Sequence, residues 1–266
     1  MLFYNEGIVR TKVGKKMLEI NNVTKTFGTG DSLFQALKGV SLSVKEGEFV
    51  GIMGPSGSGK STLLNLVGTI DQPSSGNITI DGERASNLNQ EDLAKFRRNQ
   101  LGFVFQGFNL IPTLTVAENI VLPLTLDGEK VSVMTKKLND ISEVLGIESL
   151  LNKRISNISG GQAQRVAIAR SMIHEPKLLL ADEPTGNLDT KSSKDVMRLL
   201  SELNTRLNST ILMVTHDVLA ASYCQRIVFI KDGELSDEIS RHSSQSEFYD
   251  DILFSLRQLE GEVYDF

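Results

Sequence analysis

The stretch of sequence that decides the fold is Phe49-Val50-Gly51-Ile52-Met53-Gly54-Pro55-Ser56-Gly57-Ser58-Gly59-Lys60-Ser61. Its first five residues are an apolar run with the length of a short buried strand. Residues 54–61 then match the pattern G-x-x-x-x-G-K-[ST], and a helical stretch follows from Ser61 to Val67. A strand, a glycine-rich loop and a helix in this order indicate a phosphate-binding loop and disfavour a merely structural turn.

The loop residues have the chemistry that phosphate groups require. Gly57 and Gly59 let the backbone curl so that its N–H groups point at phosphate oxygens, and the helix N-terminus adds a positive dipole. We expect Lys60 to reach the β- and γ-phosphates and the Ser61 hydroxyl to bind Mg²⁺. The predicted nucleotide-binding residues of this segment are Gly54, Ser56, Gly57, Ser58, Gly59, Lys60, Ser61 and Thr62.

A second apolar run, Leu178–Ala181, ends in two carboxylates, Asp182 and Glu183. A buried strand does not tolerate such charges, so we expect them at its carboxyl end, where α/β sheets bind ligands. Asp182 suits the Mg²⁺ shell, and Glu183 is placed to polarise a water for attack on the γ-phosphate. Alone, the pattern also fits a strand followed by a solvated turn. Together with the phosphate-binding loop it indicates nucleotide hydrolysis.

The segment 158–162, Ile-Ser-Gly-Gly-Gln, precedes a helix predicted over 161–173. Ser159 can cap this helix, and the two glycines free the backbone for contact with another anion. In isolation, an ordinary N-cap before a flexible turn is the favoured interpretation. The order of its companions along the chain points to a functional segment: the phosphate-binding loop, Gln106, this segment, Asp182-Glu183 and His216.

The coarse pattern predicts a sheet domain that is interrupted by helices. The strands expected before residue 85 are 18–23, 40–44, 49–53 and 78–80, and Asp81-Gly82 is a hairpin signal. Between about 85 and 160 the pattern is helical, with helices expected over 118–126, 135–145 and 147–151. Strands at 177–181, 210–214 and 226–230 then alternate with helices at 161–173 and 192–207. This alternation implies a parallel sheet that is covered on both faces.

Composition and charge exclude several classes of protein. Hydrophobic residues are 40% and charged residues 23% of the 266, which argues against disorder and against an integral membrane protein. The single cysteine, Cys224, excludes an intrachain disulfide and is expected to be a small buried residue. The net charge of −5 is concentrated after residue 234, so the body of the chain lacks the positive footprint of a nucleic-acid-binding protein.

Taken together, the motifs resemble those of the nucleotide-binding subunit of an ATP-binding-cassette (ABC) transporter, over residues 17 to about 235. Residues 158–162 resemble the family's LSGGQ signature, with isoleucine in place of leucine. Gln106 stands where the family has its Q-loop, residues 186–189 match its D-loop, and His216 matches its switch histidine. Phe27 matches the aromatic residue that stacks on adenine, although an aromatic near a strand end also packs in a core.

The resemblance implies an α/β fold: a P-loop NTPase core with an antiparallel β subdomain and an inserted helical subdomain over about 85–160. The nucleotide-binding domain is expected over 17–235. An N-terminal extension over 1–16, disordered or non-native, would precede it. An acidic C-terminal extension over 236–266 would follow, and its apolar residues at helical spacing predict an amphipathic helix docked on the domain.

The family also implies a head-to-tail homodimer that encloses two ATP molecules with Mg²⁺, each site combining one subunit's phosphate-binding loop with the other's signature segment. The catalytic residues implied are Glu183, His216 and Gln106. The further nucleotide-binding residues implied are Phe27, Ser159, Gly160, Gly161, Gln162 and Asp189. The metal ligands implied are Ser61, Gln106 and Asp182. His174 and His242 lack such context and are expected at the surface.

A transporter subunit of this kind requires a separate membrane permease. In the family, the permease contacts the neighbourhood of residues 107–112. The subunit would then lie on the cytoplasmic face of the cell membrane. The insert at 28–37, together with residues 186–189, resembles the broad group that serves lipoprotein release, macrolide efflux and antimicrobial-peptide resistance. Residues 70–72, 101–106, 220–224 and 226–233 and the acidic tail resemble more closely the Bce-type ATPases of bacitracin and antimicrobial-peptide resistance. Such complexes can also signal to a sensor kinase. Lipoprotein release, macrolide efflux, cell division and solute import remain alternatives.

Soluble ABC ATPases that act on DNA or ribosomes are a competing class. DNA-repair members carry a long coiled coil between the Q-loop and the signature, and no heptads occur between Gln106 and Ser159. Ribosome-acting members carry two cassettes in one chain, and this chain has one. A dimer that binds ATP but hydrolyses it poorly is a further alternative, which the presence of both Glu183 and His216 disfavours.

Overall fold

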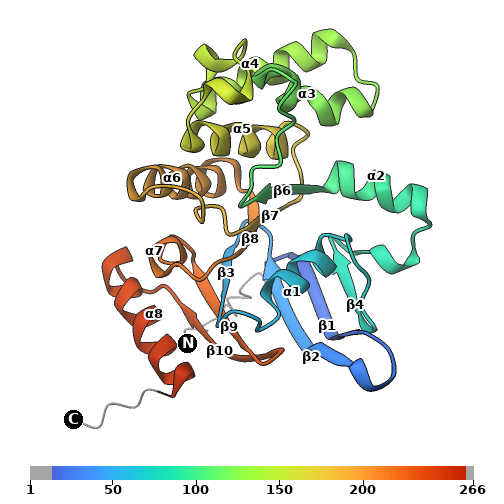
Figure 1. Ribbon diagram of the computed structural model, residues 1–266, viewed down its shortest axis with the longest axis vertical. Coiled ribbons are helices and arrows are strands. Elements are labelled where there is room, and N and C mark those ends of the chain that lie inside the picture. The colour runs from blue at the N-terminus through green and yellow to red at the C-terminus, as the bar shows by residue number, and fades with distance from the viewer. Residues whose placement is uncertain (1–13, 262–266) are drawn as a thin grey trace, which may run out of the picture.

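The computed structural model describes residues 14–261, and Figure 1 shows their arrangement. The predicted extension 1–16 and the last residues of the predicted tail therefore lie largely outside the described residues. A six-stranded sheet crosses the molecule in the order β10-β9-β3-β8-β7-β6. Its strands are β3 (Phe49–Met53), β6 (Leu101–Phe105), β7 (Leu178–Asp182), β8 (Thr210–Val214), β9 (Arg226–Lys231) and β10 (Glu234–Ser240).

The central strands are parallel because both faces of the sheet are buried. Every residue of β3 and β8 is buried, and β3 pairs in parallel with both β8 and β9. Continuous apolar runs of this kind are typical of parallel sheets covered by helices. One face packs against helices α5 (Gly160–Met172), α6 (Thr190–Leu207), α7 (Val218–Ala221) and α8 (Gln245–Glu260), and the other packs against α1 (Lys60–Val67) and the smaller sheet (Figure 1). The parallel sheet predicted from the sequence is confirmed.

A second, antiparallel sheet of four strands has the order β2-β1-β4-β5. Its strands are β1 (Lys16–Phe27), β2 (Phe34–Lys45), β4 (Ser75–Ile80) and β5 (Glu83–Arg84). The Asp81-Gly82 signal predicts the β4–β5 hairpin correctly, with both residues at positive φ. The β1 and β2 strands are longer than predicted, because pairing extends each of them beyond its alternating core to the tip at residues 28–33.

The helices are α1 (Lys60–Val67), α2 (Gln90–Gln100), α3 (Val116–Leu126), α4 (Val131–Leu145), α5 (Gly160–Met172), α6 (Thr190–Leu207), α7 (Val218–Ala221) and α8 (Gln245–Glu260). Short 3-10 turns lie at Gly30–Ser32, Ala85–Asn87, Glu148–Leu150 and Ile155–Asn157. No helix among residues 14–261 combines the length and apolar character that crossing a bilayer requires. The α/β fold with an antiparallel sheet and a helical region agrees with the expectation.

The helical range predicted over 85–160 differs from the structure in two respects. It contains β6, which pairs in parallel with β7 and so belongs to the large sheet. The packed helices α3 and α4 begin only at Val116 (Figure 1). The apolar run Leu101–Phe105 has strand character, but the helical periods on either side obscured it. The predicted helix over 147–151 is only the 3-10 turn Glu148–Leu150.

The chain after β9 returns along the edge of the sheet before it forms the last helix. Asp232 and Gly233 lie in the left-handed region and turn the chain into β10, an antiparallel edge strand with mostly exposed residues. Alternation in β10 is too weak to predict a strand.

In α8, Phe248 and Ile252 are fully buried against the large core, so the tail helix is packed on the domain. Cys224 is also buried, as predicted.

Candidate functional site

The phosphate-binding loop is shaped by two glycines with left-handed backbone angles. Gly57 has φ +79° and Gly59 has φ +103°. A Cβ at Gly57 would meet no atom within 4 Å, whereas one at Gly59 would lie 2.7 Å from the carbonyl oxygen of Ala36. The loop therefore presents bare backbone to open space at the start of α1, which is the geometry that holds phosphate.

Lys60 is the first residue of α1, and its side chain folds back over the loop. Nζ donates to the carbonyl oxygens of Gly54 and Pro55, each at 2.8 Å. Burial lowers the pKa of the Lys60 ammonium group, and the charges of Glu183 and Asp182 oppose this shift. A nearly buried cation beside a backbone cradle is suited to a highly charged anion.

Ser61 and Asp182 meet where α1 begins and β7 ends. The Ser61 hydroxyl donates to Asp182 Oδ1 at 3.4 Å. Burial raises the pKa of the Asp182 carboxyl, and the charge of Glu183 raises it further. A cation would relieve both effects, and hydroxyl and carboxylate oxygens are the ligands that Mg²⁺ prefers, so the pair fits that ion. Within residues 14–261 no group of three or more His, Cys, Asp or Glu could hold a metal alone, so phosphate and water would complete the shell.

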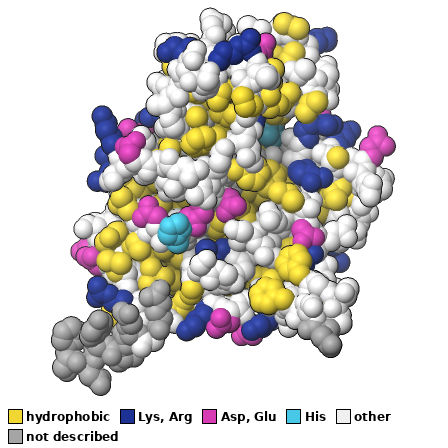
Figure 2. Space-filling model, viewed as in Figure 1, with side chains coloured by type: hydrophobic (Ala, Val, Ile, Leu, Met, Phe, Trp, Pro, Cys, Tyr) yellow, Lys and Arg dark blue, Asp and Glu magenta, His cyan; other side chains and the backbone are white. Residues whose placement is uncertain are grey.

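Glu183 and His216 form the second half of the site. The His216 Nδ1 lies 2.9 Å from Glu183 Oε1, and its backbone N–H lies 3.4 Å from Oε2. The Glu183 side chain is 15% exposed and that of His216 is 71% exposed. Figure 2 shows a histidine standing out of the surface beside acidic side chains on this face. The pair places a shielded carboxylate next to an imidazole that is open to an incoming group.

Gln106 follows β6, directly beside the carboxylates, because Phe105 pairs with Asp182 in the sheet. Its Nε2 donates to Asn187 Oδ1 at 3.4 Å, and Asn187 Nδ2 donates to the Gln106 carbonyl oxygen at 3.0 Å. The predicted Q-loop and D-loop residues are thus joined by hydrogen bonds within one chain. The sequence did not predict this contact, because it spans 81 residues.

A cavity of about 370 Å³ lies over the phosphate-binding loop. Its lining residues are Phe27, Phe34, Ala36, Ser56, Gly57, Gly59, Lys60, Ser61, Thr62 and Glu183. Seven of the predicted site residues from the loop and the hairpin, together with Glu183, line this one space. Phe34 and Ala36 belong to the insert at 28–37, and the sequence alone does not assign them to the site. Only the hairpin register shows that Phe34 lies opposite Phe27.

The signature segment and Asp189 lie outside the lining of this cavity. Ser159 caps α5 in a reciprocal capping box with Gln162. A Cβ at Gly161 would lie 2.9 Å from Ser192 Oγ, so the start of α5 packs against the start of α6, which Asp189 caps. Hydrogen bonds from Ser192 lower the pKa of the Asp189 carboxyl. Gly160 lies in the same place, 3.5 Å from Leu188 by the same measure. These residues form a separate surface, distinct from the cradle of the same chain.

Ser58 is 4% exposed, and its Oγ has no hydrogen-bond partner within the part of the chain that the structure describes. Its carbonyl oxygen accepts from the Gly233 N–H at 3.1 Å, which anchors the loop to the β9–β10 turn.

The surface prediction for His174 is wrong. The residue is half-buried, with Nε2 3.0 Å from the Leu101 carbonyl oxygen, because α5 packs over β6.

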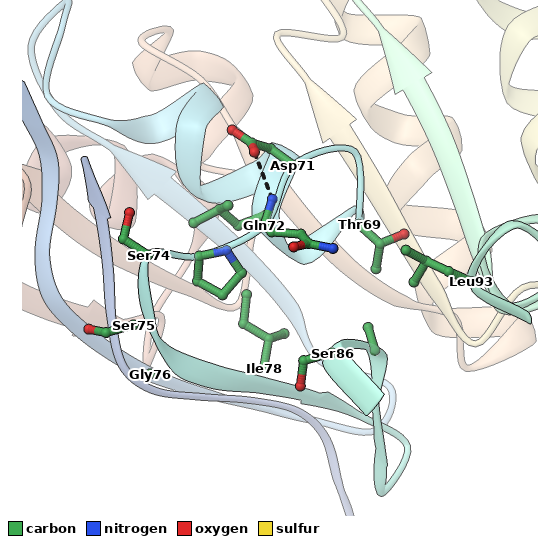
Figure 3. A pocket seen from close by; sticks show the side chains of 12 residues that line it. Thr69, Asp71, Gln72, Ser74, Ser75, Gly76, Ile78, Ser86 and Leu93 are labelled. Carbon is green, nitrogen blue, oxygen red and sulfur yellow. Dashed lines mark hydrogen bonds between the residues drawn. The ribbon is translucent and has the colours of Figure 1, made fainter. Parts of the chain in front are cut away.

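Another hollow, of about 200 Å³, lies between the end of α1, β4 and α2 (Figure 3). Asp71 accepts there from the Gln72 N–H at 2.7 Å, and its carboxylate also binds Lys25 at 2.7 Å. None of the predicted site residues lines it. The candidate site is therefore the cradle over α1, and this hollow is not part of it.

Comparison with known proteins agrees with this geometry. Residues 37–186 match the family described as ABC transporter. The chain is 57% identical to "ABC transporter ATP-binding protein YxdL" of Bacillus subtilis (strain 168), over 94% of this chain and 96% of that protein. It is 46% identical to "Bacitracin export ATP-binding protein BceA" of Halalkalibacterium halodurans, over 94% of this chain and 99% of that protein.

A solved structure is also similar. It is described as the dimeric structure of a post-hydrolysis state of the ATP-binding cassette MJ0796 bound to ADP and Pi, a protein of Methanocaldococcus jannaschii. The two chains superpose with a TM-score of 0.78 at 43% identity, over 86% of this chain and all of the other.

Proposed function

Because the chain belongs to the ABC transporter family, we propose that it binds and hydrolyses ATP as the nucleotide-binding subunit of a membrane transporter. The observation that carries this proposal is the convergence of the phosphate-binding loop, Asp182, Glu183 and His216 at one edge of the sheet. These residues come from three separate segments, and only the parallel order of β3, β8 and β7 brings them together.

Different groups of the chain would bind different parts of the nucleotide. The backbone N–H groups of residues 57–61 and the Lys60 ammonium hold the phosphates, and Phe27 takes the base. Ser61, Asp182 and Gln106 are the candidate ligands of Mg²⁺, which would neutralise charge on the phosphate oxygens. Asp182 and Glu183 then have different roles, one toward the metal and one toward water.

Glu183 is the proposed general base. Its carboxylate would accept a proton from the water that attacks the γ-phosphate, and His216 would hold the γ-phosphate and the water in line. The hydrogen bond between His216 Nδ1 and Glu183 Oε1 supports these two roles, because it holds the two side chains next to each other. Gln106 is hydrogen-bonded to Asn187, and a movement of Gln106 on nucleotide binding would be transmitted to the helical region.

The separate surface formed by Ser159, Gly161 and Asp189 supports a head-to-tail homodimer. A signature segment that lies apart from its own cradle is available to complete the cradle of a second copy. The dimeric, ADP- and Pi-bound state described for MJ0796 supports a dimer of this chain. Two ATP molecules would bridge the subunits, so ATP would favour closure and hydrolysis would favour opening.

A groove of about 370 Å³ beside β6 is the proposed docking place for the permease. Its floor is apolar and includes Phe103 and Phe105, whose rings stack at 5.5 Å. Arg170 forms part of its wall and donates to the carbonyl oxygens of Phe108 and Asn109 at 2.9 and 2.6 Å. The segment 107–112 is thereby fixed between the groove and Gln106, which supports its expected role at the permease contact.

The finer assignment is to the Bce-type group, in which the transporter acts in resistance to bacitracin-like antimicrobial peptides. The 46% identity with a bacitracin export ATP-binding protein over nearly the full length of both chains supports it. The chain would then lie at the cytoplasmic face of the cell membrane, held there by its permease, with a sensor kinase as a further partner of the complex.

Recovery of the tagged chain from native membranes in mild detergent, with its partners identified by mass spectrometry, tests this proposal. A permease with many spans and one large extracellular insert is the expected partner. A lipoprotein-release, macrolide-efflux or importer permease would contradict the peptide-resistance assignment but keep the ATPase role. Recovery of no integral membrane protein would contradict the transporter role.

A further inference from the structure

The cavity over the phosphate-binding loop has two aromatic residues at its mouth. Phe27 ends β1 and Phe34 begins β2, and the two are direct partners in the antiparallel ladder. Partners in such a ladder point to the same face of the sheet with Cβ atoms about 5 Å apart. Both side chains line the cavity, so the hairpin presents a pair of rings to the space above the loop.

Both rings are exposed at the surface of the chain. Phe27 is 42% exposed and Phe34 is 59% exposed, and hydrophobic side chains are visible on this face beside the hairpin tip (Figure 2). Large apolar groups on a surface cost hydration free energy, so an exposed pair at the mouth of a cavity points to a ligand that covers it. Neither ring belongs to the two buried cores of the described residues.

The two ends of the cavity differ in chemistry. The end at the loop has backbone N–H groups, hydroxyls and Lys60, which suit phosphate oxygens. The end at the hairpin has Phe27, Phe34 and Ala36, none of which carries a polar side-chain group. A flat, apolar, aromatic group attached to a polyphosphate is the ligand that matches both ends, and a nucleobase has this form.

The Phe27 ring has a cation over one face. Lys25 Nζ lies 4.9 Å from the centroid of the Phe27 ring and is held there by Asp71 at 2.7 Å. A cation over one face leaves the opposite face of the ring for stacking on a base. Phe34 has no such neighbour among the aromatic–cation pairs of the described residues and adds apolar area beside Phe27.

We propose that Phe34 is a second base-contacting residue, and that Phe27 and Phe34 together bind the nucleobase by stacking and apolar contact. The inference rests on the proposed nucleotide site and adds to it a residue and a mode of recognition. Because stacking uses the π-face that every base has, the contact with Phe34 does not distinguish adenine from guanine. The phosphate end of the cavity is unaffected by it.

The test compares three ligands by calorimetry on the purified full chain: ATP, GTP and inorganic tripolyphosphate. Phe34→Ala is expected to weaken ATP and GTP binding by about tenfold each, since base–aromatic stacking is worth on the order of 1–3 kcal/mol. Tripolyphosphate binding is expected to stay unchanged. Leu33→Ala is the matched control, because Leu33 is 62% exposed on the same hairpin and does not line the cavity.

The outcomes separate this inference from the proposed function. Unchanged ATP affinity in Phe34→Ala would overturn the role of Phe34 and leave the nucleotide site standing. An equal loss for tripolyphosphate would also overturn it, because the effect would then come from a disturbed loop. Phe34→Trp, which keeps a stacking ring, is expected to restore affinity for both nucleotides. A wild-type chain that binds no ATP would overturn the proposed function and this inference together.

Discussion

His216 Nδ1 lies 2.9 Å from Glu183 Oε1, and this contact joins the ends of two neighbouring parallel strands. Asp182, the last residue of β7, pairs with Val214, the last residue of β8. Glu183 then adopts φ +47°, a left-handed angle that is uncommon for a residue with a side chain. The turn directs its carboxylate toward the loop after β8. A backbone angle of this kind at a strand end suggests that strain is accepted here for function.

Glu183→Gln is expected to lower the turnover number for ATP by about 10²-fold or more, because an amide cannot accept the proton of the attacking water. ATP affinity is expected to change little, since Lys60 and Ser61 remain. Steady-state phosphate release and equilibrium ATP binding measure the two effects. Glu175→Gln is the matched control, because Glu175 is another glutamate at positive φ, and its side chain is 79% exposed on a distant turn. Wild-type turnover in Glu183→Gln would show that another group is the base.

Ser159→Arg is expected to prevent ATP-driven dimerisation while ATP binding to the single chain persists. The substituted side chain would add bulk and charge at the surface that is proposed to meet the second cradle. The control is Ser244→Arg, because Ser244 caps α8 through the same kind of capping box and its loss costs a similar amount of helix stability, about 1 kcal/mol. Light scattering with and without ATP distinguishes the two variants. Dimerisation of Ser159→Arg would contradict the head-to-tail arrangement.

Thr69→Gly is expected to stabilise the fold by about 1 kcal/mol. Thr69 follows α1 with φ +56°, in a cap where Ile70 N–H bonds to the Asn65 carbonyl oxygen, and this left-handed angle costs a β-branched residue about 1–2 kcal/mol. Its buried Oγ1 also has no partner among the described atoms. Urea unfolding measures the change. Thr125→Gly, inside α3, is expected to destabilise by about 1 kcal/mol instead, since glycine there only weakens a helix.

Phe248→Ala is expected to cost about 3–5 kcal/mol of unfolding free energy, because the ring is fully buried between α8 and the core. Phe254→Ala, on the same helix but 63% exposed, is expected to change it by less than about 0.5 kcal/mol. Chemical denaturation of both variants checks the pair. Equal, small effects would show that α8 does not pack as described.

Stability is expected to fall as the pH drops below the usual histidine range, in part through His174. Burial lowers the pKa of this imidazole, so the unfolded chain binds a proton that the folded chain resists. The contribution of His174 is therefore complete above the ordinary pKa of about 6.5 and is lost as the pH falls below it. His174→Gln should reduce the difference in melting temperature between about pH 8 and about pH 5.5. His242→Gln, at an exposed position, should leave it unchanged.

Much of this organisation follows from local patterns. The apolar runs at 49–53, 178–181 and 210–214 identify buried strands, and the spacing of glycines and Lys60 identifies the cradle without any tertiary information. Ser159 is recognisable as a helix cap by its residue type and position. Each of these signals lies within about ten residues of chain.

The features that were missed depend on pairing between distant segments. β10 has no buried residue, and only its ladder with β9 makes it a strand. Phe34 becomes a site residue through its register with Phe27, and His174 becomes buried because α5 crosses β6. The Gln106–Asn187 contact likewise arises from the packing of two loops. Periodicity and residue type carry no information about such partners.

The central claim is that ATP joins two copies of this chain through the cradle of one and the signature segment of the other. Light scattering of purified Glu183→Gln with and without Mg-ATP tests it most directly, because slow turnover would hold the closed state. A single chain of 29.3 kDa without nucleotide and about twice that mass with ATP is the predicted result. A mass that stays at 29.3 kDa while ATP is demonstrably bound would contradict the account.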